Sequence, residues 1–494
     1  MTYSRPHRSS SISGPRDPYT GIDYNLGFHV LHYSLDLDYN VGPNHLQATA
    51  VLTVENYRAL TTLSLDLAST LKVSKVSLRV YGGGPRASVK RFRHSNNKLH
   101  ITMDAELPED TSFDLSIRYS GTPRPLPSQW GDVGWEETTH GALVAGQPTG
   151  AASWFPCDDT PDEKATYRIA ITASRDTTAL ATGQLSSERS RGASTTRVFE
   201  VNYPMSTYLA AVYVGPFQRH ELPAATIGRK TVPVYAWLPA GTPEAREIRE
   251  KVQKDFAQQT AMVEAFSQMF GPYPFPEYGV VIADEELEIP LEAQALSMFG
   301  CNHADGQGTY ERLIAHELAH QWFGNSVGLV EWSDIWLNEG FACYSEWLWF
   351  EHSRGIPAAH HAWAHYQGLR AKPQDMVLVD PGAQDMFDDR VYKRGALAVH
   401  AVRVLLGDEA FFDLLTQWTR DHRTGLVETS DWENMVRRTI AGLRGVSGEA
   451  ADMIFDAWLH SPQLPAFPES PDHPRPELDE QALRDLPAGE SCSL

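Results

Sequence analysis

The first 220 residues alternate hydrophobic and polar side chains with a period of two. The alternation is clearest over residues 31–38, 113–120 and 167–172, where Leu, Ile, Phe or Tyr occupies every second position. A period of two is typical of β-strands that have one buried and one solvated face. Glycine and proline interrupt these runs as turns, for example at residues 121–123. The pattern predicts an antiparallel β domain.

After about residue 240 the hydrophobic spacing becomes that of helices. Apolar side chains recur three or four positions apart over residues 243–270, and helical segments dominate to about Leu459. The last residues are rich in proline and acidic side chains, which favours an extended or disordered tail with at most a short helix over 476–486. The pattern divides the chain into four parts: a disordered arm over 1–20, the β domain over 21–220, a mainly helical domain over 221–465 and an acidic, proline-rich tail over 466–494.

Composition excludes several functional classes. The chain has 494 residues, with 42 Lys and Arg against 63 Asp and Glu, for a net charge of −21. Such an acidic chain is a poor partner for nucleic acid, because phosphate contacts need Lys and Arg. No apolar run approaches the roughly 18 residues of a membrane span, and the N-terminus lacks the apolar core of a secretory signal. Four cysteines make no disulfide framework. We expect a cytoplasmic protein without membrane or nucleic-acid partners.

The strongest chemical signal is the run HELAH over residues 316–320. Its surroundings have helical spacing, and two side chains four positions apart share one face of a helix. His316 and His320 can then bind one tetrahedral metal ion, while Glu317 points at its open position and takes a proton from water. The alternative is a chance match on a surface helix. Chance predicts about 0.1 such matches in this composition, so the motif alone leaves that alternative open.

A third ligand is predicted at Glu339, 19 positions after His320. Catalytic zinc sites commonly use two histidines and one glutamate, which leaves one coordination position for water. Ser333 and Asp334 offer an N-cap for a helix that carries Glu339 and ends before Gly355. A solvated surface glutamate is the alternative, but the tryptophans, leucine and phenylalanine around Glu339 disfavour an exposed face. The cofactor that this set predicts is Zn.

Two longer motifs resemble the gluzincin zinc aminopeptidases, a family that includes aminopeptidase N and leukotriene hydrolase. They are HELAHQWFGN over residues 316–325 and WLNEGFA over residues 336–342. The run WFPCDDTPDEKA over residues 154–165 is also similar to a signature of that family, and the resemblance extends over residues 20–465. It implies an α+β fold, in which an antiparallel β domain precedes a mainly helical, thermolysin-like zinc domain. We expect the family's large C-terminal helical domain to be absent, and with it a more open cleft or one closed by another subunit.

The resemblance implies three further site residues. Tyr392 lies in YKRG, where the family has Tyr-x-Lys-Gly, and would stabilise the oxyanion. Glu292 lies in IPLEA, at the place of the family's Gly-x-Met-Glu-Asn, and would bind the substrate's free amino group; only the glutamate of that motif is retained. Gln147 takes the place of a polar residue of the β domain near the same ammonium, where an amide can accept a hydrogen bond but adds no charge.

These residues together predict a zinc metallo-aminopeptidase that removes the N-terminal residue from peptides. Its partners are peptide substrates with a free N-terminus, and the sequence assigns no oligomeric state. Three alternatives remain open. A thermolysin-like endopeptidase or an epoxide hydrolase would share the zinc site. A non-catalytic peptide-binding module would account for the altered amine-binding motif, although such a module has no use for a general base at Glu317.

Overall fold

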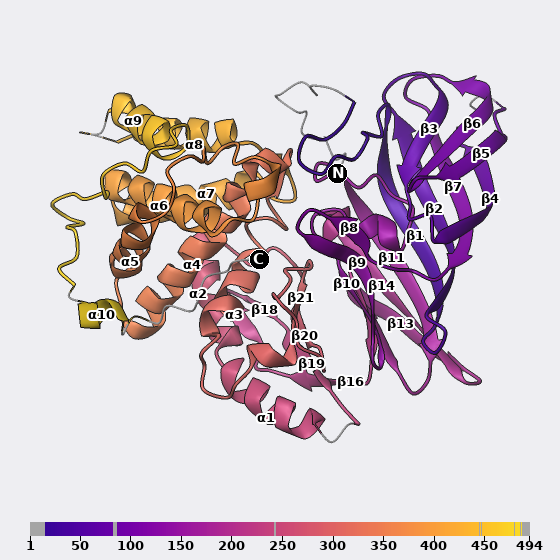
Figure 1. The fold of residues 1–494 in the computed structure, drawn as a ribbon, viewed down its shortest axis with the longest axis horizontal. Helices are drawn as coiled ribbons and strands as arrows, with labels where there is room; N and C mark the ends of the chain where they lie inside the picture. The colour runs from indigo at the N-terminus through magenta and orange to yellow at the C-terminus, as the bar shows by residue number, and fades with distance from the viewer. Residues whose placement is uncertain are drawn as a thin grey trace.

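The computed structural model describes residues 15–82, 86–241, 244–443, 445, 447–478, 480–484 and 486. A β-rich lobe formed by the first half of the chain lies beside a lobe that contains the helices (Figure 1). This is the α+β arrangement that the sequence predicts. Most of the predicted N-terminal arm lies outside the described residues. Where the description begins, Asp17 and Tyr19 are buried, so the end of that arm is packed against the protein.

The β lobe is built on one large sheet. Its strands run in the order β13 (Gln184–Arg191), β14 (Ser194–Ser206), β11 (Lys164–Ser174), β1 (Phe28–Asn40), β2 (His45–Asn56), β7 (Ser112–Gly121) and β4 (Leu71–Val80). Neighbouring strands are antiparallel except β1 and β11, which are parallel. The alternation that predicted these strands matches their burial over most of β1, with Tyr33, Leu35 and Leu37 inside.

Leu31 departs from this alternation. The sequence places it on the same face as Tyr33, yet its side chain is exposed while Val30 is buried. The pairing of β1 with β2 shifts register between Val30 and His32, which marks a β-bulge. An extra residue in one strand moves the following side chains to the opposite face. The prediction for Leu31 is therefore wrong because hydrophobic alternation alone cannot locate a bulge.

Two smaller sheets complete the β lobe. One has the order β12 (Thr178–Ala181), β15 (Val212–Gly215), β10 (Gly141–Ala145), β9 (Gly131–Thr138) and β8 (Leu126–Ser128). The other consists of β3 (Leu60–Asp66), β6 (Lys98–Leu107) and β5 (Val89–Ser95). Two 3₁₀ turns, η1 (Ala151–Ser153) and η2 (Thr207–Leu209), are fully buried. The second of these turns faces the helical lobe, because Gln294 of that lobe donates its backbone N–H to the Leu209 carbonyl.

The helical lobe contains a sheet that the sequence analysis missed. Its strands are β16 (Phe217–Glu221), β19 (Val234–Pro239), β20 (Tyr278–Ile282) and β21 (Leu296–Phe299), beside the short pair β17 (Ala225–Ile227) and β18 (Lys230–Val232). Every residue of β20 and β21 is buried. Strands covered on both faces show no alternation and are hard to distinguish from helical core. Since β16 pairs with β19, the change of sheet comes a few residues before the predicted boundary at 220.

After residue 244, the described part of the chain forms ten helices. They are α1 (Ala245–Asp255), α2 (Gln259–Phe270), α3 (Glu311–Ala319), α4 (Trp336–Arg354), α5 (Ala358–Arg370), α6 (Asp389–Leu406), α7 (Asp408–Asp421), α8 (Thr429–Ala441), α9 (Gly448–Trp458) and α10 (Glu480–Arg484). Short elements link them: η3 (Cys301–His303), η4 (Trp332–Asp334), η5 (Ala383–Asp385), and the pair β22 (Gly328–Leu329) and β23 (Leu426–Val427). Helix α4 is buried over nearly its whole length, so it is the central helix of this lobe.

The residues at the two ends of α4 can be compared with those that the sequence predicts. At the C-terminal end, Gly355 adopts the left-handed conformation with φ 66°, as its place after the last helical turn predicts. At the N-terminal end the predicted cap is wrong. Asp334 belongs to η4, and its carboxylate accepts hydrogen bonds from the Oγ1 (2.6 Å) and backbone N–H (3.2 Å) of Thr429. Asp334 therefore ties α4 to the start of α8.

Several contacts join the lobes and the tail. Tyr19 donates its hydroxyl to Asp380, and Trp130 donates its indole N–H to the Ala383 carbonyl (3.0 Å). At the start of the predicted tail, Phe467 is buried and packs edge-on against Trp363. The first part of that tail is thus ordered against α5.

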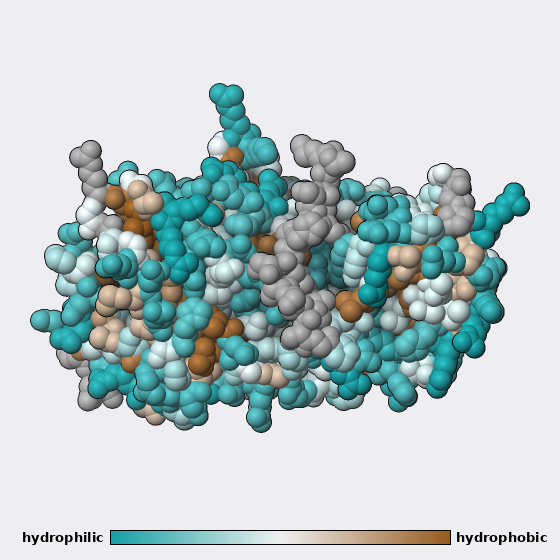
Figure 2. Space-filling model, turned by 90° about the horizontal axis from the view of Figure 1, so that it is seen from above, coloured by the Kyte–Doolittle hydropathy of each residue, from teal (hydrophilic) through white to brown (hydrophobic). Residues whose placement is uncertain are grey.

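None of the helices in the described ranges combines the length and the apolar character needed to cross a membrane. On the face seen in Figure 2, hydrophilic residues predominate and hydrophobic ones form small, separate groups. The three described cysteines, Cys157, Cys301 and Cys343, are free thiols, and Cys492 lies outside the described residues.

Candidate active site

Helix α3 brings two imidazoles together on its buried face. His316 and His320 lie one helical turn apart, and their ring centroids are 4.7 Å from each other. Both side chains are almost fully buried. The helix ends at Ala319, and the four-residue spacing is preserved because His320 keeps helical dihedral angles. The structure therefore places both predicted histidine ligands side by side.

Glu339 reaches the same point from α4. Its Oε2 atom lies 3.3 Å from Nε2 of His316 and 3.3 Å from Nε2 of His320. Ligand atoms at zinc's usual bond lengths in a tetrahedral arrangement are separated by about 3.3 Å. The three side chains are the group in the described residues whose ligand atoms could hold one metal ion. Two neutral imidazoles and a carboxylate suit zinc, so the residues fit the metal that the sequence predicts.

The outer nitrogen of each imidazole has its own partner. Nδ1 of His316 donates to Oε1 of Glu346 at 2.8 Å, and Nδ1 of His320 donates to the Phe323 carbonyl at 3.0 Å. These contacts fix both rings with Nε2 directed at Glu339, the usual arrangement around a metal-binding histidine. The guanidinium of Arg312 lies 3.4 Å from Glu346. Sequence reasoning missed Glu346, although its position seven residues after Glu339 places both carboxylates on one face of α4.

The pKa values of the carboxylates and of His320 in this cluster are set by burial and by the neighbouring charges. Burial raises the pKa of Glu339, but the adjacent His320 and His316 outweigh that effect and hold it at about 2. Burial lowers the pKa of His320, while the Glu339 carboxylate outweighs it and raises the pKa to about 9. For Glu346, burial is outweighed by Arg312 and then Lys393, so its pKa is far below the ordinary value. Glu339 and Glu346 are therefore held ionised, as a metal ligand and its hydrogen-bonding partner require.

Close packing of α4 against α6 places Tyr392 over the cluster. A Cβ atom on Gly340 would lie 2.8 Å from Cα of Gly395, and one on Gly395 would lie 2.8 Å from Cα of Gly340. Only glycine at both positions allows this backbone approach. Tyr392, three residues before Gly395, is buried with its ring stacked 6.0 Å from that of His316. Gly340, which follows Glu339, and Gly395, one turn after Tyr392, thus let the two helices approach and bring Glu339 and Tyr392 to the same cluster.

Two more carboxylates face the cluster. Glu317 is buried between the histidines, and burial raises its pKa to about 7 against the lowering effect of His316 and His320. Glu292 is also buried, which raises its pKa, and its Oε1 atom has no hydrogen-bond partner among the described residues. The charges of His320 and Glu339 act on Glu292, so it lies near the metal-binding group. The structure brings together Glu317 and Glu292 as the sequence predicts.

The position of Gln147 relative to the cluster can be described only through its neighbours. It follows Gly146, whose missing side chain lets the backbone pack on the Tyr208 carbonyl; a Cβ there would lie 2.2 Å from that oxygen. In the described part of the chain, Gln147 makes no hydrogen bond to the cluster, and its buried Nε2 lacks a partner. The phenol of Tyr208 senses the charges of Glu292 and Glu339, which add to the burial that raises its pKa. Tyr208, missed by sequence reasoning, therefore packs on the segment that carries Gln147 and lies near enough to Glu292 and Glu339 to be affected by their charges.

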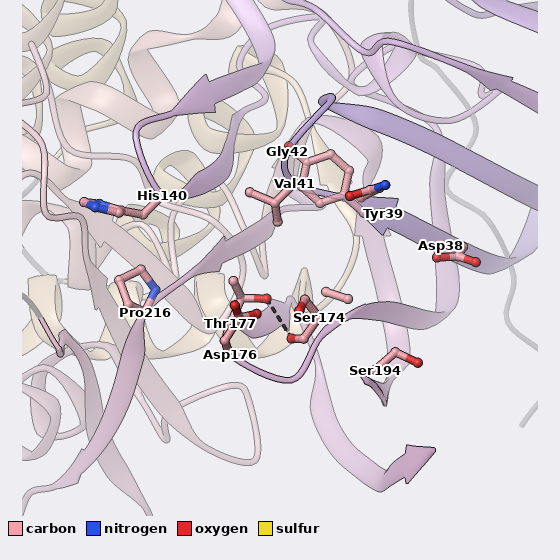
Figure 3. A pocket seen from close by; sticks show the side chains of 12 residues that line it. Asp38, Tyr39, Val41, Gly42, His140, Ser174, Asp176, Thr177, Ser194 and Pro216 are labelled. Carbon is pink, nitrogen blue, oxygen red and sulfur yellow. Dashed lines mark hydrogen bonds between the residues drawn. The ribbon is translucent and has the colours of Figure 1, made fainter. Parts of the chain in front are cut away.

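A separate hollow of about 580 Å³ lies on the β lobe, at the turn between β1 and β2 (Figure 3). Its lining includes Asp38, Tyr39, His140 and Thr177. Thr177 donates its hydroxyl to the Ser174 carbonyl at 2.9 Å, a local turn contact. None of the residues in the metal-binding cluster lines this hollow, so it is distinct from the candidate active site.

Comparisons with known proteins agree with this geometry. The peptidase M1 N-terminal domain model matches residues 29–209, and the peptidase family M1 domain model matches residues 255–458. Aminopeptidase M1-D of Oryza sativa subsp. japonica is 26% identical over 425 residues, which are 81% of this chain and 46% of the relative. Leukotriene A-4 hydrolase of Xenopus laevis is 25% identical over 89% of this chain and 72% of its own.

Solved structures extend the likeness to nearly the whole chain. The M1 zinc metallopeptidase of Deinococcus radiodurans superposes with a TM-score of 0.79 at 29% identity, covering 92% of this chain and 99% of its own. A variant of that protein has been solved with a Tyr-Ser-Ala substrate. By contrast, the chain spans less than half the length of several curated relatives, among them the rice aminopeptidase.

Proposed function

Because the chain belongs to peptidase family M1, we propose that it is a zinc aminopeptidase that removes the N-terminal residue from peptides. The observation that carries this proposal is one buried cluster in which His316, His320 and Glu339 converge within 4.8 Å. Glu317 and Glu292 border the same cluster. A general base and an unpaired carboxylate beside a metal site are the two features that amide hydrolysis at a free N-terminus requires. A cytoplasmic location stays a prediction from the sequence.

His316, His320 and Glu339 hold the zinc ion. The bound metal supplies a Lewis acid that polarises the scissile carbonyl and makes water easier to deprotonate. Glu346 and the Phe323 carbonyl orient the two imidazoles, so that both Nε2 atoms remain available as ligands. These residues bind the metal and orient its imidazole ligands, whereas Glu317 transfers the protons.

Glu317 acts as the general base. It takes a proton from the attacking water and delivers it to the leaving amine. Its burial favours the neutral acid, and the neighbouring imidazoles favour the carboxylate, so the pKa of about 7 lies where both forms are accessible. Such a balance suits a group that must accept a proton and then release it.

Tyr392 stabilises the oxyanion that forms as water adds to the carbonyl. Tyr392→Phe removes the hydrogen-bond donor and keeps the ring that stacks on His316. We expect kcat to fall by about 10²–10³ with little change in KM, as for the loss of one oxyanion donor. Steady-state kinetics with an aminoacyl anilide measures both constants. Tyr366→Phe, which removes a hydroxyl bonded to the Pro465 carbonyl, is the matched control and should keep near-normal kcat. Equal kcat in the two variants would remove Tyr392 from this role.

Glu292 binds the substrate's ammonium group. Its buried carboxylate has an unpaired oxygen, and a charged hydrogen bond is worth about 1.5–3 kcal/mol, or 10–100-fold in affinity. We expect N-acetylated peptides to be cleaved at least tenfold less efficiently than free ones, and Glu292→Gln to raise KM for free peptides by 10–100-fold. Comparing kcat/KM for paired free and acetylated peptides tests both. Glu264→Gln, a helix α2 residue bonded to the Thr226 N–H, is the control.

The same comparison distinguishes the aminopeptidase from the main alternative, an endopeptidase. An endopeptidase on this zinc site would cleave acetylated and free peptides equally well, and Glu292→Gln would leave that ratio unchanged. Such a result would contradict the aminopeptidase proposal while leaving the metal site intact.

A further inference from the structure

The segment that carries Glu292 lacks the residues by which the family motif is recognised. Ala293 follows the glutamate where the family has Asn, and Ala295 is held at φ 60°, a conformation that favours glycine. An amine-binding carboxylate must nevertheless be held in one place. Other side chains of this protein must therefore fix the backbone from residue 292 to residue 295.

Two amide side chains just beyond His320 hold this backbone. The Nδ2 atom of Asn325 donates to the Glu292 carbonyl at 2.7 Å, and Oε1 of Gln321 accepts from the Ala295 N–H at 2.7 Å. Asn325 also donates to Oε1 of Gln321 at 3.1 Å, which joins the two contacts into one network. Both amides are completely buried. A buried amide engaged with main-chain groups fixes the position of that backbone strongly.

The loop that carries Asn325 also orients a metal ligand. The backbone N–H of Asn325 donates to the His320 carbonyl at 3.0 Å, and the Phe323 carbonyl accepts from Nδ1 of His320. The loop is closed by a bond from the Gly324 N–H to the Val327 carbonyl at 2.8 Å. Residues 320–327 therefore connect the metal-binding helix directly to the segment with the amine-binding carboxylate.

Lys164 of the β lobe clamps this loop. Its ammonium donates to the carbonyls of Asn325 (3.0 Å), Ser326 (3.1 Å) and Gly425 (3.0 Å), which uses all three donors. The side chain is buried, and a Cβ atom on Gly328 would lie 2.7 Å from its Cε. Burial lowers the pKa of Lys164 to about 7, so keeping the charge there opposes folding. Lys164 thus keeps a buried charge, with two of its three donors on the 320–327 loop and the third on Gly425, which indicates a positioning function.

We propose that Asn325 is the positioning residue for Glu292, and that Lys164 holds Asn325 in place from the β lobe. This inference rests on the proposed function, in which Glu292 binds the substrate's ammonium. Asn325 acts through the Glu292 backbone and touches no reacting atom. Disturbing it should weaken recognition of the free amine while the metal site and the general base continue to work. The β lobe thereby takes part in substrate recognition through the contacts of Lys164 with the backbone of the 320–327 loop.

The test replaces Asn325 by Asp, which keeps the shape but puts an acceptor opposite the Glu292 carbonyl. We expect KM for an aminoacyl anilide to rise about tenfold, as for one lost buried hydrogen bond, with kcat changed less than threefold and zinc content unchanged. Lys164→Met should raise KM in the same direction by a smaller factor. The dissociation constant of a free amino acid, measured by calorimetry, should rise in parallel with KM. Asn56→Asp is the matched control, because Asn56 is also buried and donates to main-chain carbonyls far from the site.

The outcomes separate this inference from the proposed function. If Glu292→Gln raises KM and Asn325→Asp does not, the positioning role is wrong and the amine site stands. If Glu292→Gln leaves KM unchanged, the amine site itself is wrong. A loss of kcat and zinc with constant KM in Asn325→Asp would assign the residue to the metal site and overturn the proposal. Should that variant not fold, Asn325→Ser, whose shorter side chain cannot reach the Glu292 carbonyl, should also raise KM with little change in kcat; an unchanged KM overturns the inference.

Discussion

Glu317→Gln will keep its zinc and lose nearly all of its turnover. The substitution preserves shape and hydrogen-bonding capacity in a buried position but removes the group that accepts the proton of water. Loss of a positioned general base typically lowers the rate by about 10²–10⁴, and we expect kcat to fall by that factor. Because Glu317 is not one of the three ligands, metal content should stay at the wild-type level. Zinc analysis of the purified protein and steady-state kinetics measure the two quantities together.

A control on the same helix makes the result specific. Glu311 begins α3, where it accepts hydrogen bonds from the Trp349 indole and from Arg354, away from the metal-binding residues. Glu311→Gln should keep kcat near the wild-type value. Full turnover by Glu317→Gln would remove Glu317 from its role. A variant that loses zinc along with activity would instead make Glu317 part of the metal site.

The sequence predicts three candidate ligands that the structure groups within 4.8 Å of one another, and two of them follow from a local rule. His316 and His320 are four positions apart on one helix, and that spacing alone fixes their separation. Glu339 is 19 positions further on, in another helix. Its place could be inferred only because aromatic neighbours excluded an exposed face and because a resemblance supplied the motif. The prediction therefore depended on helix geometry for two ligands and on family knowledge for the third.

The parts that sequence could not predict depend on contacts between distant segments. Nothing near Asn325 in the sequence indicates that its side chain binds the Glu292 carbonyl, 33 positions earlier. Lys164 appears in the sequence as one charge among others of an acidic motif, and only the fold places it against three carbonyls. Glu346 carried a usable signal, since it lies two helical turns from Glu339, but a glutamate on a helix is usually solvated. Tertiary packing decides each of these cases.

Similar limits explain the errors in secondary structure. The bulge at Leu31 reverses the face of one hydrophobic residue, and the fully buried strands β20 and β21 have no alternation to detect. The predicted cap at Asp334 failed because Thr429, far away in sequence, competes for the same carboxylate. Only at Asp334 did a long-range contact override a local rule; in the strands, the pattern that the rule needs was shifted or missing.

Glu339 and Glu346 offer a matched pair for distinguishing a metal ligand from the residue that orients one. Both are buried glutamates on α4, seven positions apart, and each contacts His316: Glu339 at Nε2 and Glu346 at Nδ1. Glu339→Gln removes the charged ligand, so we expect no zinc to remain after dialysis against a mild chelator and activity to be lost. Glu346→Gln should weaken zinc binding by about 10–100-fold, the usual effect of losing a ligand's outer partner.

The two variants should therefore differ in how they respond to added metal. Excess zinc restores activity to Glu346→Gln, because its three ligands are intact and only their orientation has relaxed. Excess zinc does not restore Glu339→Gln, because two imidazoles remain where three ligands are needed. Titration of each variant with zinc, followed by both metal content and kcat, measures the difference. If Glu346→Gln lost zinc more completely than Glu339→Gln, the assignment of the carboxylate ligand would be reversed, since both side chains reach the same histidine from opposite sides of its ring.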